Sequence, residues 1–476
     1  MDKGTTRRGF FKKSALAAGG VAVGVVAMEI ASPLMFKEVL EFDSNNSLWA
    51  HYRPPKNSPL TEDIELDVAV IGGGYTGLSS AYHIKKMFPG RSVAVFEAKH
   101  VGYGGSGRNG GLVGPQPAKD HMKIFSDIKT HKRMDDMTIE SLHELKQLAR
   151  SEGFGSEICH RGKLSVAVNE NQLAEMKSYA ETERSLGIPI EWWDREKTVH
   201  SLGTDVYYGA LYDPRVWEIN PMKLVHALKK AAERYGAVIY EESPVSAIEE
   251  GEVITLTVGE QKHTVKAKAV VLATNGYTTK LGYFKNSVLA IHTQMAVTPP
   301  LSESIFSELG WRNRIPFADR RNYLYHIGNT TDNRIFVAGG KAYYFFNNGI
   351  IYRVDRDEAF LDMKQELIRV YPKLSHIQFE YSWNGVLGMS LDFSTSVGIT
   401  GERKNVFYGL SYNAHGVNLA FFFGKVIADL YAGDGDRWKE LPLLNASLPF
   451  VPPEPLKWVG IRGAFAYYRM LDELSV

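Results

Sequence analysis

DVAVIGGGYTG, at residues 67–77, is the stretch that decides the fold of this chain. Its first part is almost wholly apolar and predicts a buried parallel strand, and the glycine-rich part predicts a turn. The apolar residues that follow at Leu78, Ala81 and Ile84 are spaced as on one face of a helix. Strand, glycine turn and helix in this order are typical of a dinucleotide-binding unit.

The three spaced glycines have separate tasks in such a unit. Gly72 permits the tight turn, Gly74 lets the backbone approach a pyrophosphate, and Gly77 allows the helix to pack closely on the strand. Tyr75 and Thr76 stand at the start of the helix, where free N–H groups attract an anion. These five residues are therefore our first candidates for cofactor contact.

A second apolar strand, at residues 92–96, ends in Glu97 and Ala98. Glu97 follows Gly77 by about 20 residues, where an acidic side chain accepts hydrogen bonds from ribose hydroxyls. We expect this strand end to contact the adenosine part of a dinucleotide.

Residues 104–111 read GGSGRNGG, which is too rich in glycine for a strand or a stable helix. Residues 102–107 formally match a second glycine fingerprint, which is rejected because no apolar strand leads directly into it. The stretch at 104–111 supplies hydroxyl, guanidinium and amide groups, and we interpret it as a loop that cradles the cofactor, with a flexible surface loop as the alternative. The candidate contacts in it are Gly105, Ser106, Arg108, Asn109, Gly110 and Gly111.

Several segments resemble the FAD-dependent D-amino-acid-oxidase superfamily, and most closely its branch of amine oxidases similar to gamma-glutamylputrescine oxidoreductase. They are LWA at 48–50, GGYTGLSSAYHIKK at 73–86, VGYGGSGRNGG at 101–111, ATNG at 273–276, WNG at 383–385 and YNAHGV at 412–417. The resemblance implies FAD, bound non-covalently, as the cofactor. It adds eight candidate contacts: Val245, Ala273, Thr274, Gly276, Asn413, His415, Gly416 and Val417.

The same resemblance implies an α/β fold with a Rossmann-type, glutathione-reductase-like FAD domain and an antiparallel-sheet substrate domain. Alternating runs at 164–168 and 334–338 are typical of antiparallel strands. We divide the chain into a Tat signal or anchor at 1–32, a linker at 33–63, a discontinuous FAD domain at 64–150, 220–283 and 383–433, a substrate domain at 151–219 and 284–382, and a tail at 434–476. The tail either packs as a closing helix or lies on a membrane surface.

Candidates for catalysis or for the substrate face are His415, Lys341, Tyr325, His326 and Trp383. His415 precedes an apolar helix and is expected beside the flavin N1–O2 edge, where reduction builds negative charge. Core packing is the plainer role for the aromatic candidates. The family often has Tyr-Arg where this chain has Tyr325-His326, so the usual arginine for a substrate carboxylate is missing, which favours amines. Arg320 and Arg321 are the other candidates for that contact.

The composition argues against several classes of protein. Lys and Arg total 55 against 54 for Asp and Glu, with no long run of one sign, so we expect no nucleic-acid partner. The single cysteine, Cys159, excludes an intrachain disulfide and a cysteine-rich metal site, and we expect it to be buried. The histidines have no metal-ligand spacing, so we expect no metal.

Only one dinucleotide unit is present, so electrons come most simply from a small-molecule substrate. Three functions stay open. The first is an oxidase that transfers a hydride from an amine or amino acid to flavin N5, hydrolyses the imine and uses O2. The second is a dehydrogenase of similar chemistry that passes electrons to quinone or a cytochrome. The third is a non-catalytic FAD-binding assembly factor.

The N-terminus reads TRRGFFK at 6–12, followed by a weakly apolar stretch at 15–28, and resembles a Tat signal. This implies the Tat translocase as a partner and a location in the periplasm or on the outer face of the cytoplasmic membrane. Cleavage near Ala31 and retention as a membrane anchor both stay open.

Overall fold

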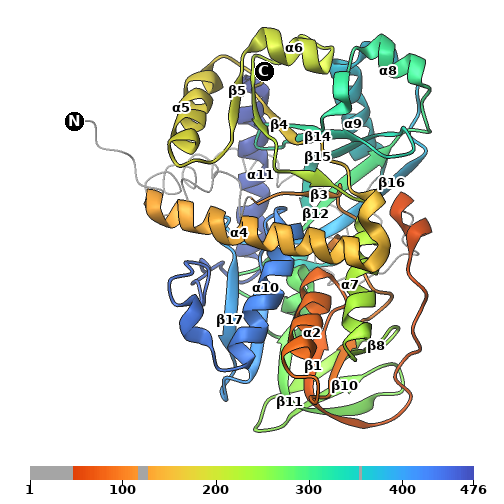
Figure 1. The fold of residues 1–476 in the computed structure, drawn as a ribbon, viewed down its shortest axis with the longest axis vertical. Coiled ribbons are helices and arrows are strands. Elements are labelled where there is room, and N and C mark those ends of the chain that lie inside the picture. Colours follow the sequence, from red (N-terminus) through yellow and green to blue (C-terminus); the bar gives the residue numbers. More distant parts are fainter. Residues whose placement is uncertain (1–46, 116–126, 353–355, 476) are drawn as a thin grey trace.

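The computed structural model describes residues 47–115, 127–352 and 356–475. Two eight-stranded sheets form its framework, one in the lower and one in the upper half of Figure 1. The Tat prediction at 1–32 lies outside the described residues. The α/β fold class with a parallel-strand domain and a largely antiparallel domain is confirmed.

The first sheet contains the strand of the glycine fingerprint and has the order β17-β18-β11-β1-β2-β8, with β10 and β9 added beside β11. Its strands are β1 (Ile64–Ile71), β2 (Val93–Phe96), β8 (Val238–Tyr240), β9 (Val245–Glu249), β10 (Ile254–Val258), β11 (His263–Leu272), β17 (Ser396–Thr400) and β18 (Val406–Leu410). β1 runs parallel to β2 and β11, and β18 runs parallel to β11. The carboxyl ends of these strands therefore meet at one edge.

Helices with buried apolar faces pack over this sheet or on one another. They are α2 (Tyr75–Met87), α4 (Ile128–Ala149), α7 (Pro221–Arg234) and α10 (Gly416–Tyr431). α7 has a well-capped start: the Asn220 side chain accepts from the N–H groups of Met222 and Lys223, and Pro221 occupies the first helical position. α10 packs along α2, and their buried faces join the core of the first sheet.

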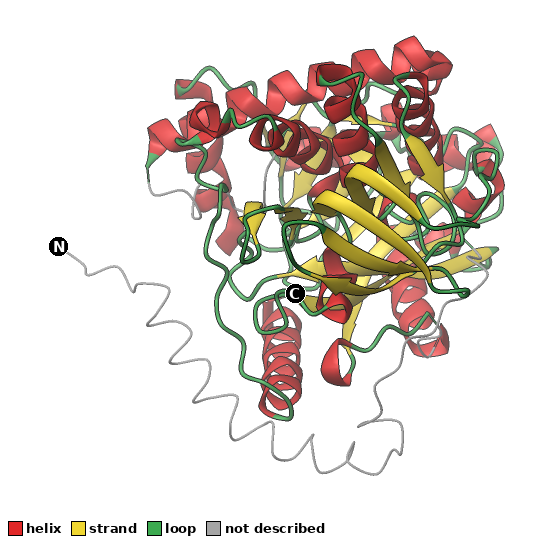
Figure 2. Ribbon diagram, turned by 90° about the horizontal axis from the view of Figure 1, so that it is seen from below, coloured by secondary structure: helices red, strands yellow, loops and turns green. Residues whose placement is uncertain are grey.

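The second sheet has the order β16-β12-β15-β14-β13-β4-β6-β5. Its strands are β4 (Lys163–Val166), β5 (Glu191–Trp193), β6 (Ala210–Asp213), β12 (Leu289–Val297), β13 (Phe317–Asp319), β14 (Tyr325–Asn329), β15 (Ile335–Tyr344) and β16 (Tyr381–Met389). Neighbours are antiparallel except for β13 and β4, which are parallel. Around it lie α5 (Asn171–Ser185), α6 (Arg195–Leu202), α8 (Glu303–Leu309) and α9 (Arg356–Val370). Figure 2 shows the strands in the interior of the molecule.

The strand pairing corrects one predicted domain boundary. We assigned the chain from Trp383 to the FAD domain, but β16 pairs along its whole length with β12 of the second sheet. Its partner is distant in sequence, so the local motif does not reveal the pairing. A two-stranded ribbon of β3 (Leu112–Val113) and β7 (Trp217–Glu218) also joins the two predicted domains. Cys159, expected to be buried, is half-buried.

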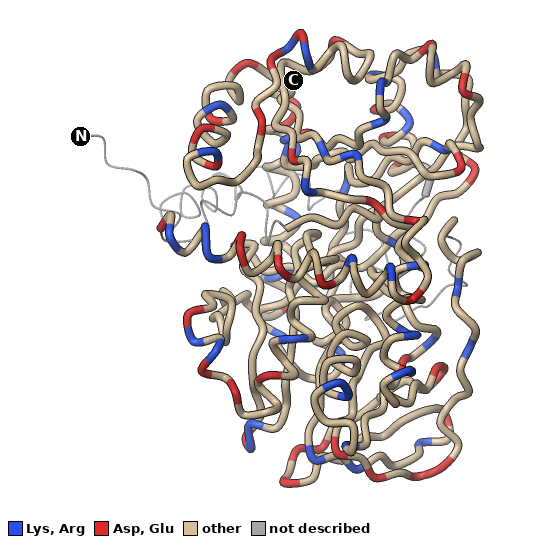
Figure 3. Tube along the Cα trace, in the orientation of Figure 1, with Lys and Arg blue, Asp and Glu red and all other residues tan. Residues whose placement is uncertain are grey.

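The C-terminal tail ends in α11 (Leu456–Ser475). Trp458 and Ile461 are buried against Leu289 and Tyr344, so the helix packs on the second sheet. Leu456 and Leu474 remain exposed. Among the described helices none is long and apolar enough to cross a membrane. Figure 3 shows acidic and basic residues interspersed along the trace.

Candidate active site

The glycine turn lies at the carboxyl edge of the first sheet and is tightly enclosed. Gly72 has φ +106°, and a Cβ atom there would lie 2.7 Å from the carbonyl oxygen of Ala273. A Cβ on Gly77 would lie 1.9 Å from the carbonyl oxygen of Gly72. Both positions therefore require glycine, and the turn brings Ala273 and Thr274 at the end of β11 beside the start of α2.

Glu97 lies at the end of the neighbouring strand and points to the same turn. Its carboxylate accepts hydrogen bonds from the N–H of Gly73 at 2.8 Å and of Lys99 at 3.0 Å. Burial raises the pKa of Glu97 to about 7 despite these bonds. The Glu97 carbonyl accepts from the N–H of Ser243 at 2.8 Å, which brings the segment leading to Val245 to this strand end. A buried acceptor thus lies where a ribose is expected.

The glycine-rich loop at 104–111 is held in place by its own polar groups. The N–H of Tyr75, in the first turn of α2, donates to Ser106 Oγ at 3.0 Å. The Asn109 amide donates to the carbonyl oxygens of Gly105 and Ser106, at 3.1 and 2.9 Å. The loop therefore lies over the N-terminus of α2, as a cofactor cradle requires.

Arg108 joins this loop to the second sheet. Its buried guanidinium donates to the carbonyl oxygens of Tyr103 at 2.8 Å and Asn384 at 3.0 Å. The same group lies over the rings of Tyr103 and Tyr352, 4.8 and 4.3 Å from their centroids. These contacts fix Arg108 between the two sheets.

Two tryptophans hold the loop backbone. The indole N–H of Trp383 donates to the Arg108 carbonyl oxygen, and that of Trp49 donates to the Asn109 carbonyl oxygen, both at 2.9 Å. Their rings meet edge to face, with centroids 6.0 Å apart. Trp383, proposed from sequence for the substrate face, is buried and positions the loop. The sequence analysis did not select Trp49 as a candidate residue, although the LWA segment that contains it resembles the family.

The segment after β18 completes this edge. The N–H of Ser411 donates to Asn275 Oδ1 at 3.0 Å, and the Thr76 and Tyr412 hydroxyls are 2.6 Å apart. Asn413, Gly416 and Val417 belong to this segment. His415 is the N-cap of α10, but its side chain caps no backbone N–H, and its Nδ1 lies 2.9 Å from the Asn413 carbonyl oxygen. The segment that leads into α10 therefore contacts the first turn of α2.

These residues fit FAD. A helix start whose N-cap, Gly74, has no side chain suits a pyrophosphate, and the buried carboxylate of Glu97 suits a ribose. Five segments that are far apart in sequence meet at this sheet edge: the glycine turn, the strand end at Glu97, the 104–111 loop, the end of β11 and the segment after β18.

The candidate catalytic residues divide between two faces of the second sheet. His326 lies on the side of the glycine loop, where a Cβ on Gly110 would be 3.2 Å from its ring. Its Nε2 is buried and has no hydrogen-bond partner among the described residues. Burial, with a contribution from the charge of Lys163, lowers the pKa of His326 to about 3. The ring is therefore neutral at physiological pH.

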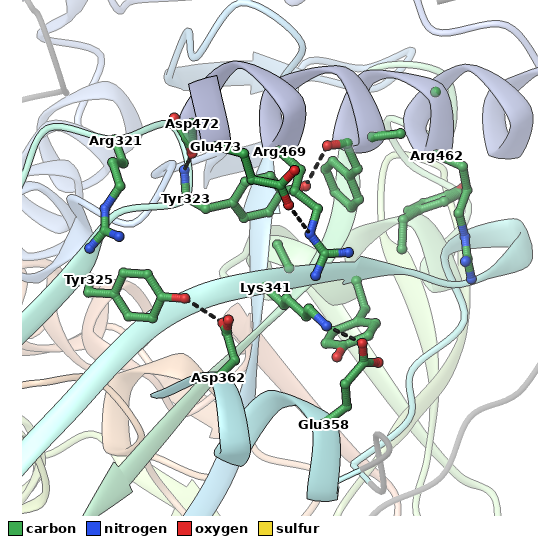
Figure 4. Close-up of a pocket in the computed structure, with 16 residues that line it drawn as sticks. Arg321, Tyr323, Tyr325, Lys341, Glu358, Asp362, Arg462, Arg469, Asp472 and Glu473 are labelled. Carbon is green, nitrogen blue, oxygen red and sulfur yellow. Dashed lines mark hydrogen bonds and ion pairs between the residues drawn. The ribbon is translucent and has the colours of Figure 1, made fainter. Parts of the chain in front are cut away.

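Tyr325, the neighbour of His326 on β14, points to the opposite face. Its hydroxyl donates to Asp362 of α9, and Lys341 forms an ion pair with Glu358 of the same helix. Tyr325 and Lys341 line a cavity of about 440 Å³ in which Tyr323 also takes part (Figure 4). Hence the structure brings His326 and Trp383 to the glycine loop but not Tyr325 or Lys341.

The sequence analysis did not identify a cluster of buried polar side chains inside the second sheet. Gln294 and Asn384 are directly paired across β12 and β16, and both are buried. Both amide atoms of Gln294 and Oδ1 of Asn384 have no hydrogen-bond partner among the described residues. Burial lowers the pKa of the neighbouring His292 to about 4. Polar residues at alternate positions of an apolar strand could have indicated this cluster from the sequence.

Comparisons with known proteins show to which family the chain is similar. A family model described as "FAD dependent oxidoreductase" matches residues 67–430. Gamma-glutamylputrescine oxidoreductase of Escherichia coli (strain K12) is 30% identical over 88% of this chain and 95% of its own length. Glycine oxidase of Geobacillus kaustophilus is 23% identical over 76% of this chain and 92% of its own length.

Solved structures show the same fold. The crystal structure of glycine oxidase from Geobacillus kaustophilus has a TM-score of 0.69 and 20% identity, and covers 81% of this chain and 100% of that chain. L-Proline dehydrogenase from P. horikoshii has a TM-score of 0.66 and 20% identity, with 79% and 94% covered. With the family match spanning most of its length, this chain belongs to the FAD-dependent oxidoreductase family.

Proposed function

We propose that this protein oxidises primary or secondary amines and prefers them to simple α-amino acids. The observation that carries the proposal is His326, which is neutral and lies against the glycine loop. A neutral imidazole forms no ion pair with a substrate carboxylate. Two relatives, a gamma-glutamylputrescine oxidoreductase and a glycine oxidase, support C–N oxidation in general.

Two buried arginines support the same preference. Arg321 is held by Asp319 and by Glu366, the latter at 2.6 Å, and it lies with Tyr325 on the other face of the sheet from His326. Arg108 is engaged by two carbonyl oxygens and two aromatic rings. Freeing Arg321 for a substrate carboxylate would break a buried ion-pair network, at a cost of about 3–5 kcal/mol. Freeing Arg108 would break its two hydrogen bonds.

The chain supplies orientation and electrostatics for the reaction. When bound, FAD would supply the acceptor for the hydride removed from the carbon that carries the amine, and water would hydrolyse the imine. The glycine turn, Glu97 and the 104–111 loop would hold the cofactor. The N–H groups at the start of α10, with His415, would stabilise the negative charge that reduction builds. The buried surroundings of His326 favour the neutral amine, whose lone pair the reaction requires.

A steady-state comparison of kcat/KM for amines and their α-carboxylated counterparts tests the substrate preference. We expect the amine of each pair to have the higher value, and His326→Arg to shift the ratio toward the carboxylated partner. A higher value for the carboxylated partner in the unmodified enzyme would refute the preference.

The location of the protein is a separate proposal. Arg7 and Arg8, followed by an apolar stretch, support export of the folded flavoprotein by the Tat route. Replacing both with Lys should leave the flavoprotein in the cytoplasm, whereas unchanged periplasmic or membrane fractionation would speak against Tat transport.

A further inference from the structure

The cavity lined by Tyr325 and Lys341 is separate from the flavin side of the second sheet. Tyr325 and His326 are neighbours on β14 and point to opposite faces, and His326 is the one against the glycine loop. One wall of the cavity is α11, which begins after residue 430, where the family match ends. The cavity therefore includes an element outside the matched region, and its size suits a small molecule.

Charges of both signs line this cavity. Glu358 and Asp362 lie four residues apart on one face of α9. On α11, Arg462 and Arg469 lie seven residues apart, and Asp472 and Glu473 follow them. Figure 4 shows the side chains of α11 above β15 and those of α9 below it.

Arg469 and Lys341 each have an acidic partner in this cavity. Arg469 pairs with Glu473 at 3.6 Å, and both side chains are exposed. Lys341 pairs with Glu358 and lowers its pKa, and the charge of Arg469 adds to this effect across the cavity.

Aromatic rings lie between the charged walls. Tyr323 packs edge to face on Phe465 of α11, with ring centroids 6.1 Å apart, and its hydroxyl donates to the Phe465 carbonyl oxygen. Tyr325 donates to Asp362. Tyrosine rings beside a carboxylate attract an ammonium group, and arginine suits a carboxylate.

We propose that this cavity binds a small dipolar molecule, an ω-amino acid whose ammonium group lies against Asp362 and Tyr325 and whose carboxylate lies against Arg469 and Arg462. The ligand takes up both charges of the cavity at once, so a molecule with only one of them binds less well. The site does not depend on the flavin reaction, and it stands even if amines prove not to be substrates.

Equilibrium dialysis of labelled ε-aminocaproate against the FAD-loaded protein tests this proposal. The flavin is first reduced with dithionite under nitrogen, so that the amine is not oxidised. We expect saturable binding, with unlabelled caproate and hexylamine competing at least about tenfold more weakly than unlabelled ε-aminocaproate. Failure of ε-aminocaproate to bind would overturn the proposal.

Variants on the two walls locate the ligand. Asp362→Asn keeps an acceptor for the Tyr325 hydroxyl and removes only the charge, and Arg469→Gln removes an exposed arginine. Each should weaken binding by about tenfold or more. Arg133→Gln, which removes a comparable exposed arginine paired with Glu440 at 2.5 Å, should bind as the unmodified protein does.

His326→Asn separates this cavity from the flavin side and should retain binding. Loss of binding in His326→Asn, or unchanged binding in both Asp362→Asn and Arg469→Gln, would place the ligand elsewhere and overturn the proposal.

Discussion

Glu97 links FAD binding to pH. Its carboxyl pKa is about 7 instead of 4.5, so before FAD binds the group is largely protonated below neutrality. The raised pKa contributes stability that is fully present below pH 4.5 and is lost as the pH rises through 7. Ribose hydroxyls need the carboxylate as an acceptor, so we expect FAD affinity to increase with pH up to about 7 and then level off.

Flavin fluorescence titrations of the apoprotein across this pH range measure the effect. Glu97→Gln should bind FAD about 10- to 100-fold more weakly at pH 7.5 and should lose the pH dependence, because it removes a hydrogen bond to a charged group. An affinity that stays independent of pH in the unmodified protein would contradict this role for Glu97.

Gly74 leaves no room for a side chain at the start of α2. A Cβ there would lie 2.8 Å from Ser106 Oγ, in the space that the pyrophosphate requires. We expect Gly74→Val to fold but to retain little FAD after purification, as measured by the ratio of visible to ultraviolet absorbance. Gly90→Val is the matched control, because a Cβ there meets nothing within 4 Å. Full FAD occupancy in a folded Gly74→Val protein would disprove the assignment.

For single residues, the sequence predicts those roles that depend on the local backbone geometry. Gly72 and Gly77 follow from the spacing of the fingerprint, since the steric demand of the turn is local. Trp49 and Gln294 do not follow, because their contacts join segments far apart in the chain. The neutrality of His326 is also not predictable, since it arises from burial between Gly110 and Phe336.

Among the elements, α11 offers a direct test of packing. Trp458 is only 2% exposed and contacts the second sheet, whereas its neighbour Val459 is 37% exposed. We expect Trp458→Ala to lower the free energy of unfolding by about 3–5 kcal/mol, and Val459→Ala to change it little. Thermal unfolding by circular dichroism measures both. Equal effects of the two substitutions would argue against the packed position of α11.

β16 is an element whose sheet could not be predicted from the local sequence. The sequence WNG at 383–385 resembles a flavin-ring segment, and the chain there does approach the 104–111 loop through Trp383 and Asn384. Its strand, however, belongs to the other sheet. Local pattern predicts which residues approach the cofactor loop, but strand partners are set by contacts that are distant in sequence.

At the scale of the whole molecule, a further test asks whether FAD is bound covalently or non-covalently. Cys159, the single cysteine, pairs through its backbone with Glu218 and belongs to none of the segments that carry the candidate FAD contacts. We therefore expect trichloroacetic acid to release FAD into the supernatant. Yellow colour that stays with the washed protein pellet would contradict non-covalent binding.

The central claim, that an amine reduces the FAD of this protein, is tested most directly by the visible flavin spectrum during anaerobic addition of amines and amino acids. We predict that amines bleach the flavin band and do so faster than their α-carboxylated counterparts. On admission of air, rapid recovery of the band identifies an oxidase, and slow recovery identifies a dehydrogenase that uses quinone or a cytochrome. A flavin band that no member of a broad amine and amino-acid panel bleaches would contradict the account and favour a non-catalytic FAD-binding protein.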